Sequence, residues 1–159
     1  MIKLMGTGEK MKILWLCNIV VPQILKKLGD AGTSMGGSWL VETLEKLSND
    51  DSVEIAYCAP YKSNKNITRV KYRNTIFYGF NKKKWSSHIY DKTLESTFKK
   101  ILGKFHPDIV HIFGTEFPHA LAMVKSFNCP SRTVIHIQGL AFYWGGVIEP
   151  IYQQKFIMA

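Results

Sequence analysis

Apolar and polar residues alternate in blocks along this chain, and the blocks predict five strands. Each is a short, nearly continuous apolar run, as expected of strands that are buried on both faces of a parallel sheet. Asn18 directly follows the first run, KILWLC, and Pro60 ends the second because proline cannot donate to a sheet ladder. The predicted strands are 12–17, 53–59, 75–80, 109–113 and 133–137.

Helical spacing of apolar residues appears between these strands. Ser38 is placed to cap the first helix, and Glu42 and Glu45 lie near its positively charged N-terminal end. Its apolar positions at helical spacing are Trp39, Leu40, Leu44 and Leu47. Two further amphipathic helices are predicted at 90–105 and 118–127.

Strands that alternate with helices predict an α/β fold. We expect a Rossmann-like, open, mostly parallel sheet with helices on both faces and right-handed crossovers. Residues 1–10 are predicted to form a flexible extension and 11–140 the Rossmann-like domain. Residues 141–159 form an aromatic tail, where a link to a further domain would start.

Length and composition bound the class of protein. With 159 residues, 46% of them apolar, the chain suffices for one domain with a sizeable core. No apolar run approaches the roughly 18 residues that cross a bilayer, and residues 1–10 lack the apolar stretch of a signal peptide. Cys17, Cys58 and Cys129 lie far apart, as expected of buried thiols in a reducing compartment. We therefore expect a cytoplasmic protein.

The positive charge is unevenly distributed. Residues 81–105 contribute +5 to a net charge of +9. Such a cluster predicts contact with an anionic membrane surface on the inner face of the plasma membrane, through Lys82, Lys83, Lys84 and Trp85. The alternative is a solvated lysine face on a helix whose apolar residues, Phe98 and Phe105 among them, are turned to the core. No nucleic-acid-binding motif accompanies the charge, so no nucleic-acid partner is expected.

Candidate ligand-binding residues follow the strands. In an open parallel sheet, ligands bind beyond the carboxyl ends of the strands, where the strand order reverses. If the predicted strands are ordered 3-2-1-4-5, Asn18 lies close to Thr115 and Glu116, and Gln138 borders the same crevice. Glu116 is the carboxylate at this place. It can accept a proton or hydrogen bonds from hydroxyl groups, or serve only as a loop or capping residue.

The connection at 19–37 is long for a loop between a strand and a helix, and long loops at such places are often functional. It ends in Gly36-Gly37-Ser38. Adjacent glycines let a ligand approach the backbone, and the free N–H groups of the following helical turn attract an anion such as phosphate. The segment is neither a Walker loop nor a G-x-G-x-x-G motif. Alternatively, the glycines serve only a tight turn.

Histidine spacing does not predict a metal site, because no H-x-x-x-H pair occurs. His111 and His136 lie inside apolar strand runs, which favours hydrogen-bonded core positions. His119 follows Pro118 near a helix start and can reach the crevice. The catalytic candidates are Glu116, His119 and Gln138, and no cofactor is implied.

Four segments together resemble one known family. They are KILWLCN, the Gly36-Gly37 turn that opens a helix, HPDIVHIFGTEFPHALAM and RTVIHIQGL. In order and spacing they are similar to the N-terminal, acceptor-side domain of glycosyltransferase family 4 enzymes of the GT-B type, over residues 11–140. The resemblance implies a retaining enzyme that moves a sugar from a nucleotide-sugar to a glycan or lipid-linked acceptor in cell-surface polysaccharide synthesis.

The resemblance also suggests roles for individual residues. Gly36 and Gly37 match the paired glycines that face the donor diphosphate and the acceptor. Asp108, Val110 and His111 fit a D-x-V-H-x-H-like strand, but Phe113 replaces its second histidine. The family's His-Gly pair is Gln138-Gly139 here, and glutamine has no proton chemistry at neutral pH. The residues expected to bind the donor phosphates or the acceptor are Gly36, Gly37, Ser38, Asn18, Thr115 and Gly139.

The family's second domain, which carries an E-x7-E motif, has no counterpart in residues 141–159. We therefore expect one half of such an enzyme, inactive without the C-terminal donor domain. The alternative is a non-catalytic α/β binding or interaction module with the same sheet. A flavodoxin-like regulator is a third reading, although that fold usually places several acidic residues at its strand ends.

Overall fold

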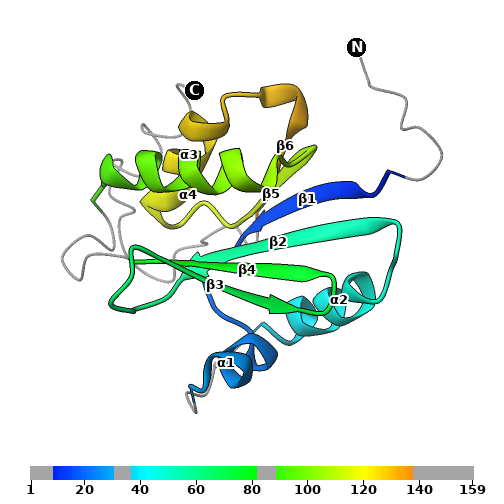
Figure 1. Cartoon of the computed structure of the whole chain (residues 1–159). Helices are drawn as coiled ribbons and strands as arrows, with labels where there is room; N and C mark the ends of the chain where they lie inside the picture. Colours follow the sequence, from blue (N-terminus) through cyan, green and yellow to red (C-terminus); the bar gives the residue numbers. More distant parts are fainter. Residues whose placement is uncertain (1–8, 31–36, 82–88, 138–159) are drawn as a thin grey trace, which may run out of the picture.

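A mostly parallel sheet organises the chain, as the computed structural model shows for residues 9–30, 37–81 and 89–137 (Figure 1). These residues form six strands in the order β3-β4-β2-β1-β5-β6. Neighbouring strands pair in parallel except β3, which is antiparallel to β4. The strands are β1 (Met11–Leu16), β2 (Val53–Pro60), β3 (Ile67–Tyr72), β4 (Thr75–Phe80), β5 (Ile109–Phe113) and β6 (Thr133–His136). The predicted α/β fold and the reversal of order at β1 are confirmed.

Helices cover both faces of the sheet (Figure 1). On one face lie α1 (Pro22–Leu28) and α2 (Ser38–Ser48), and on the other lie α3 (Thr93–Phe105) and α4 (Pro118–Phe127). Each strand sends alternate side chains to the two sides. Leu14 and Leu16 therefore join the core with α3 and α4, while Trp15 joins the core with α1 and α2.

The structure adds two elements that the sequence pattern did not predict. Helix α1 occupies part of the expected loop at 19–37; it begins at Pro22 and ends at Gly29, whose φ is 75°. Seven residues are too few to display a helical repeat. Strand β3 occupies residues expected to be a polar connection. It turns into β4 at Arg73, whose φ of 51° suits a tight turn.

The predicted cap of α2 is wrong. Gly37 is the N-cap, in a left-handed conformation with a φ of 81°, and Ser38 is already helical. Gly37 has no side chain to cap the N-terminal N–H groups, no capping bond is formed by a side chain of the described residues, and the first turn has no acidic residue. The positive end of α2 is therefore not neutralised by a carboxylate of its own first turn.

Candidate functional site

A chain of hydrogen bonds joins three sequence-predicted residues at the point where the strand order reverses. Asn18 follows β1, Glu116 follows β5, and His119 lies in the first turn of α4. Asn18 Nδ2 donates to Glu116 Oε2 at 3.2 Å. His119 Nε2 and Asn18 Oδ1 are 2.8 Å apart. The predicted closeness of Asn18 to Glu116 is confirmed, and Asn18 also contacts His119.

The direction of these hydrogen bonds follows from the Asn18 amide. Its NH₂ group is turned to Glu116, so its oxygen faces His119 and must accept. His119 Nε2 therefore carries a hydrogen. Only 3% of His119 is exposed, and the ring lies between Phe117, 5.5 Å away and nearly parallel, and Phe80, 5.5 Å away and edge-on. His119 thus positions Asn18 from within the protein.

The Glu116 side chain folds back over Gly114. A Cβ at Gly114 would lie 2.0 Å from Glu116 Oε2, so a side chain there would displace the carboxylate, and the φ of 85° itself favours glycine. Glu116 is exposed, and its Oε1 accepts no hydrogen bond from the part of the chain that the structure describes. This oxygen is available to a ligand.

The start of α2 packs against Ile19, which lies in the connection between β1 and α1. A Cβ at Gly37 would lie 2.4 Å from Ile19 Cδ1, so glycine allows the close approach of the α2 N-terminus to the residues that follow β1. Leu40 and Val41 donate to the Gly37 carbonyl, so the first helical turn is well formed. Ser38 is exposed next to it.

An aromatic cluster that the sequence analysis did not identify connects α2 to the strand ends. Trp39 is 41% exposed and stacks on His136, with ring centroids 5.6 Å apart and an interplanar angle of 22°. Its ring also lies 5.3 Å from Phe113, which in turn stacks on His111. The pattern of α2 predicted a core position for Trp39, whereas the tryptophan covers the ends of β5 and β6.

The two strand histidines differ in environment. His111 is partly buried, and burial together with the neighbouring His136 lowers its pKa below the usual range, which favours the neutral ring. His136 is exposed, so the predicted core position is wrong for this residue. The reason is that β6 has little cover among the described residues.

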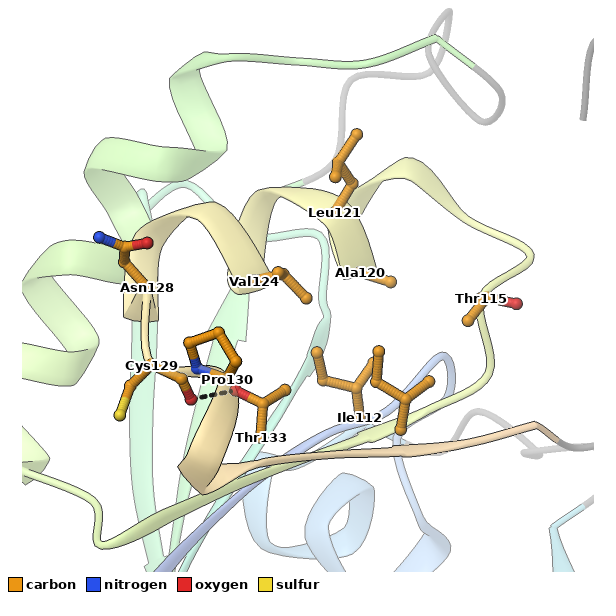
Figure 2. A pocket seen from close by; sticks show the side chains of 10 residues that line it. Ile112, Thr115, Ala120, Leu121, Val124, Asn128, Cys129, Pro130 and Thr133 are labelled. Carbon is orange, nitrogen blue, oxygen red and sulfur yellow. Dashed lines mark hydrogen bonds between the residues drawn. The ribbon is translucent and has the colours of Figure 1, made fainter. Parts of the chain in front are cut away.

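Two hollows lie near the predicted residues, and some of these residues fall outside the described ranges. Thr115, the chain neighbour of Glu116, lines a hollow between α4 and β6 (Figure 2). A second hollow, beside α1 and the end of β2, is lined by Ile19, Tyr61 and others. The predicted residues that lie outside the described ranges are Gly36, Gln138, Gly139, Lys82, Lys83, Lys84 and Trp85.

The three cysteines fall into two groups. Burial raises the pKa of the Cys17 and Cys58 thiols well above the usual range, so both stay protonated. Cys129 is partly exposed, so the prediction that it is buried is wrong. A hydrogen bond from Arg132 Nε to Sγ, at 3.2 Å, lowers the pKa of Cys129.

The basic helix α3 has two distinct faces. Leu94, Phe98 and Phe105 are buried in the core, whereas its lysines are exposed. This matches the solvated lysine face proposed as the alternative to a membrane-binding surface, and it removes both phenylalanines from any external contact. In the described ranges, no helix is long and apolar enough to cross a membrane, and no three His, Cys, Asp or Glu residues cluster as a metal site.

Comparisons with known proteins add a distant structural likeness. No protein-family model matches the chain, and no curated protein matches it. A solved structure described as "Trehalose-6-phosphate from E. coli bound with UDP-2-fluoro glucose" is similar at a TM-score of 0.42 and 13% identity. The similarity covers 72% of this chain and 30% of that chain. The chain thus spans about 30% of the length of that protein, and we draw no conclusion on activity from the likeness.

Proposed function

We propose that this chain is the acceptor-side half of a retaining glycosyltransferase, which moves a sugar from a nucleotide-sugar to a glycan or lipid-linked acceptor in cell-surface polysaccharide synthesis. The observation that carries the proposal is the chain of hydrogen bonds from His119 through Asn18 to Glu116. It presents an oriented carboxylate at the sheet position where α/β proteins bind ligands.

Glu116 is suited to hold an acceptor hydroxyl. Asn18 restrains Oε2, so Oε1 can accept the hydrogen of a sugar hydroxyl without a search over side-chain rotamers. His119 restrains Asn18 in turn and is buried, so it positions the amide and does not touch the ligand. The exposed Trp39 ring offers a flat apolar surface on which a sugar ring can pack.

The start of α2 is suited to a phosphate group. Backbone N–H groups of the first helical turn have no side-chain cap, and no acidic residue lies in that turn. A helix N-terminus of this kind attracts anions. In the complete enzyme, Gly36, Gly37 and Ser38 would stabilise the charge that develops on the leaving diphosphate. Gln138, Thr115 and Gly139 are proposed to complete the acceptor side.

The proposal requires a partner domain. The N-terminus of α2 supplies only part of the positive charge that a diphosphate needs, and in this proposal a second domain supplies the rest. We expect the chain alone to bind substrates without transferring sugar. We also propose that Lys82, Lys83, Lys84 and Trp85 bring the enzyme to an anionic membrane surface where a lipid-linked acceptor resides.

Ligand titrations followed by NMR test the proposal. UDP-glucose, GDP-mannose and a panel of oligosaccharides are added to the whole chain, and backbone amides are monitored. Nucleotide-sugars are expected to shift Ser38 and Trp39, and oligosaccharides to shift Asn18 and Glu116. Glu116→Gln should weaken oligosaccharide binding by roughly 10- to 100-fold, because a hydrogen bond to a charged group contributes roughly 1.5–3 kcal/mol.

The matched control is Glu42→Gln, which removes an exposed carboxylate of α2 and should leave binding unchanged. Equal effects of the two substitutions would contradict the role of Glu116. If no nucleotide-sugar and no oligosaccharide shifts these amides, the chain is better described as a non-catalytic α/β interaction module.

A further inference from the structure

Exposed apolar side chains gather around β6. The large apolar residues that are exposed in the described ranges are Trp39, Ile89, Val134, Ile135 and Ile137. Three of the five belong to β6 or to the residue that follows it, and Trp39 stacks on His136. Val134 is 47% and Ile135 48% exposed, although they point to opposite faces of the sheet. An apolar surface of this kind usually marks a contact.

The α4 side of β6 has an apolar groove (Figure 2). Its volume is about 270 Å³, and a buried cavity of roughly 150 Å³ already holds a benzene molecule. The groove therefore has room for one or two aromatic side chains. The side chains that enclose it include Leu121, Val124, Pro130 and Ile135, and none of its lining residues is charged.

The unpaired edge of β6 carries no feature that would discourage the addition of another strand. β6 pairs with β5 on one side, and among the described strands none pairs with its other edge. At the opposite end of the sheet, β3 carries the exposed Arg69 and Lys71, which are partly protective because charged side chains discourage strand addition. The sequence of β6, TVIH, contains no lysine, arginine or acidic residue. Both its edge and its groove therefore favour an apolar segment.

We propose that the groove between α4 and β6 is the docking site of this chain's own residues 139–159. Of the 21 residues in this segment, 13 are apolar (Ala, Val, Ile, Leu, Met, Phe, Trp or Tyr), and only Glu149 and Lys155 are charged. Within this segment, Phe142, Tyr143 and Trp144 are the aromatic residues nearest in sequence to β6. The uncharged groove and the electrically neutral segment match in chemistry.

Tethering and charge both favour this occupant over a second copy of the chain. The segment starts two residues after Ile137, so its concentration at the groove is roughly millimolar without any association step. A second copy would have to overcome the repulsion between two chains of net charge +9. The groove and the last described residue are also adjacent, because Ile135 lines the groove.

A thiol introduced at position 124 reports on the groove, because the Val124 side chain points into it (Figure 2), whereas Cys17 and Cys58 are buried. The experiment measures the rate at which a maleimide labels this thiol in the whole chain that carries Val124→Cys and Cys129→Ser. Docking should protect the thiol, so Phe142→Ser combined with Trp144→Ser should raise the rate roughly tenfold or more by exposing the groove. Ile135→Ser, on the groove wall, should raise it in the same way.

Two controls make the result specific. Cys129→Ser without the thiol at position 124 should show no rapid labelling, which assigns the signal, and Ile89→Ser, an equally polar change at another exposed isoleucine, should leave the rate unchanged. Protection that is independent of protein concentration supports docking within one chain. Protection that increases with concentration would identify a second copy and overturn the proposal, as would an unchanged rate in both groove variants.

Discussion

Strands β2 and β6 have similar sequences and opposite environments. Both are short apolar runs that pair in parallel with a neighbour. In β2, Ile55 through Ala59 are all buried, because β1 and β4 flank the strand and helices cover both faces. In β6, Val134, Ile135 and His136 are exposed. An apolar run thus predicts a strand, but its burial depends on what packs over it.

The difference separates the sheet into a covered side and an uncovered side. Strands β1, β2, β4 and β5 contribute to both apolar cores, whereas no residue of β6 belongs to either. The candidate site lies beside the boundary between β5 and β6, since Glu116 follows β5 and Asn18 follows the neighbouring β1. Its residues are therefore anchored by strands that lie in packed cores.

Matched valine substitutions give the largest expected contrast. Val110 of β5 is fully buried, and Val134 of β6 is 47% exposed. Val110→Ala should lower the free energy of unfolding by about 2–3 kcal/mol, through lost burial and a cavity. Val134→Ala should lower it by less than about 1 kcal/mol. Urea denaturation measures both, and equal losses would show that β6 is as well covered as β5.

Glycine substitutions probe the boundary itself. Gly114→Ala places a methyl group against the Glu116 carboxylate at a φ of 85°, and should cost about 1–3 kcal/mol. It should also displace Glu116 from Asn18, which NMR of the Asn18 side-chain amide detects. Gly103→Ala is the control, because nothing lies within 4 Å of the added carbon in helix α3. It should raise the free energy of unfolding by about 0.5–1 kcal/mol. The two glycine-to-alanine substitutions should therefore change stability in opposite directions.

A polar cluster on the covered side has the smallest expected effect. Glu45 of α2 accepts hydrogen bonds from Tyr72 at 2.7 Å and from Gln23 at 3.2 Å, and pairs with Arg73. The hydrogen bond from Tyr72 and the Arg73 charge lower the pKa of Glu45 below its usual 4.5. A lowered carboxylate pKa stabilises the fold above pH 4.5, and this stabilisation is lost as the pH falls through the lower folded-state value.

Glu45→Gln should therefore reduce stability by about 1 kcal/mol or less at pH 7. The difference from the wild type should disappear as both are titrated to acid pH in thermal unfolding. Glu42→Gln, on the exposed face of the same helix, should produce little change at either pH. If the stability difference between Glu45→Gln and the wild type persists at acid pH, the effect comes from changed packing or hydrogen bonding and not from the lost charge.

Sequence predicted the parallel strands well because each is an apolar run with a clear end. Pro60 and Asn18 marked two of these ends, and the order 3-2-1-4-5 that was assumed for the predicted strands matches the observed order β4-β2-β1-β5-β6. The antiparallel β3 was missed because ITRVKY lies in a basic stretch, has no continuous apolar run and alternates polar and apolar residues only in part. Helix α1 was missed because one face of a seven-residue helix contributes a single fully buried residue, Ile24.

The candidate site was predicted in part. The strand order alone brought Asn18 close to Glu116, since both follow strands that are adjacent in the sheet. The stacking of Trp39 on His136 was not predictable, because it depends on how α2 lies across β5 and β6. Likewise, the left-handed Gly37 displaced the cap from Ser38, and residue type alone does not distinguish a cap from a first helical residue.

Strand β3 reverses direction at Arg73 and folds back along β4, so one margin of the sheet is completed by a hairpin rather than by a crossover. Because the charged Arg69 and Lys71 of β3 discourage the addition of a strand, growth of the sheet is favoured at the opposite margin. Inserted or appended sequence can lengthen the sheet there without shifting the register of the strands that hold Asn18 and Glu116. Diversification of such a domain would therefore accumulate beside β6 while the arrangement of Asn18 and Glu116 stays constant.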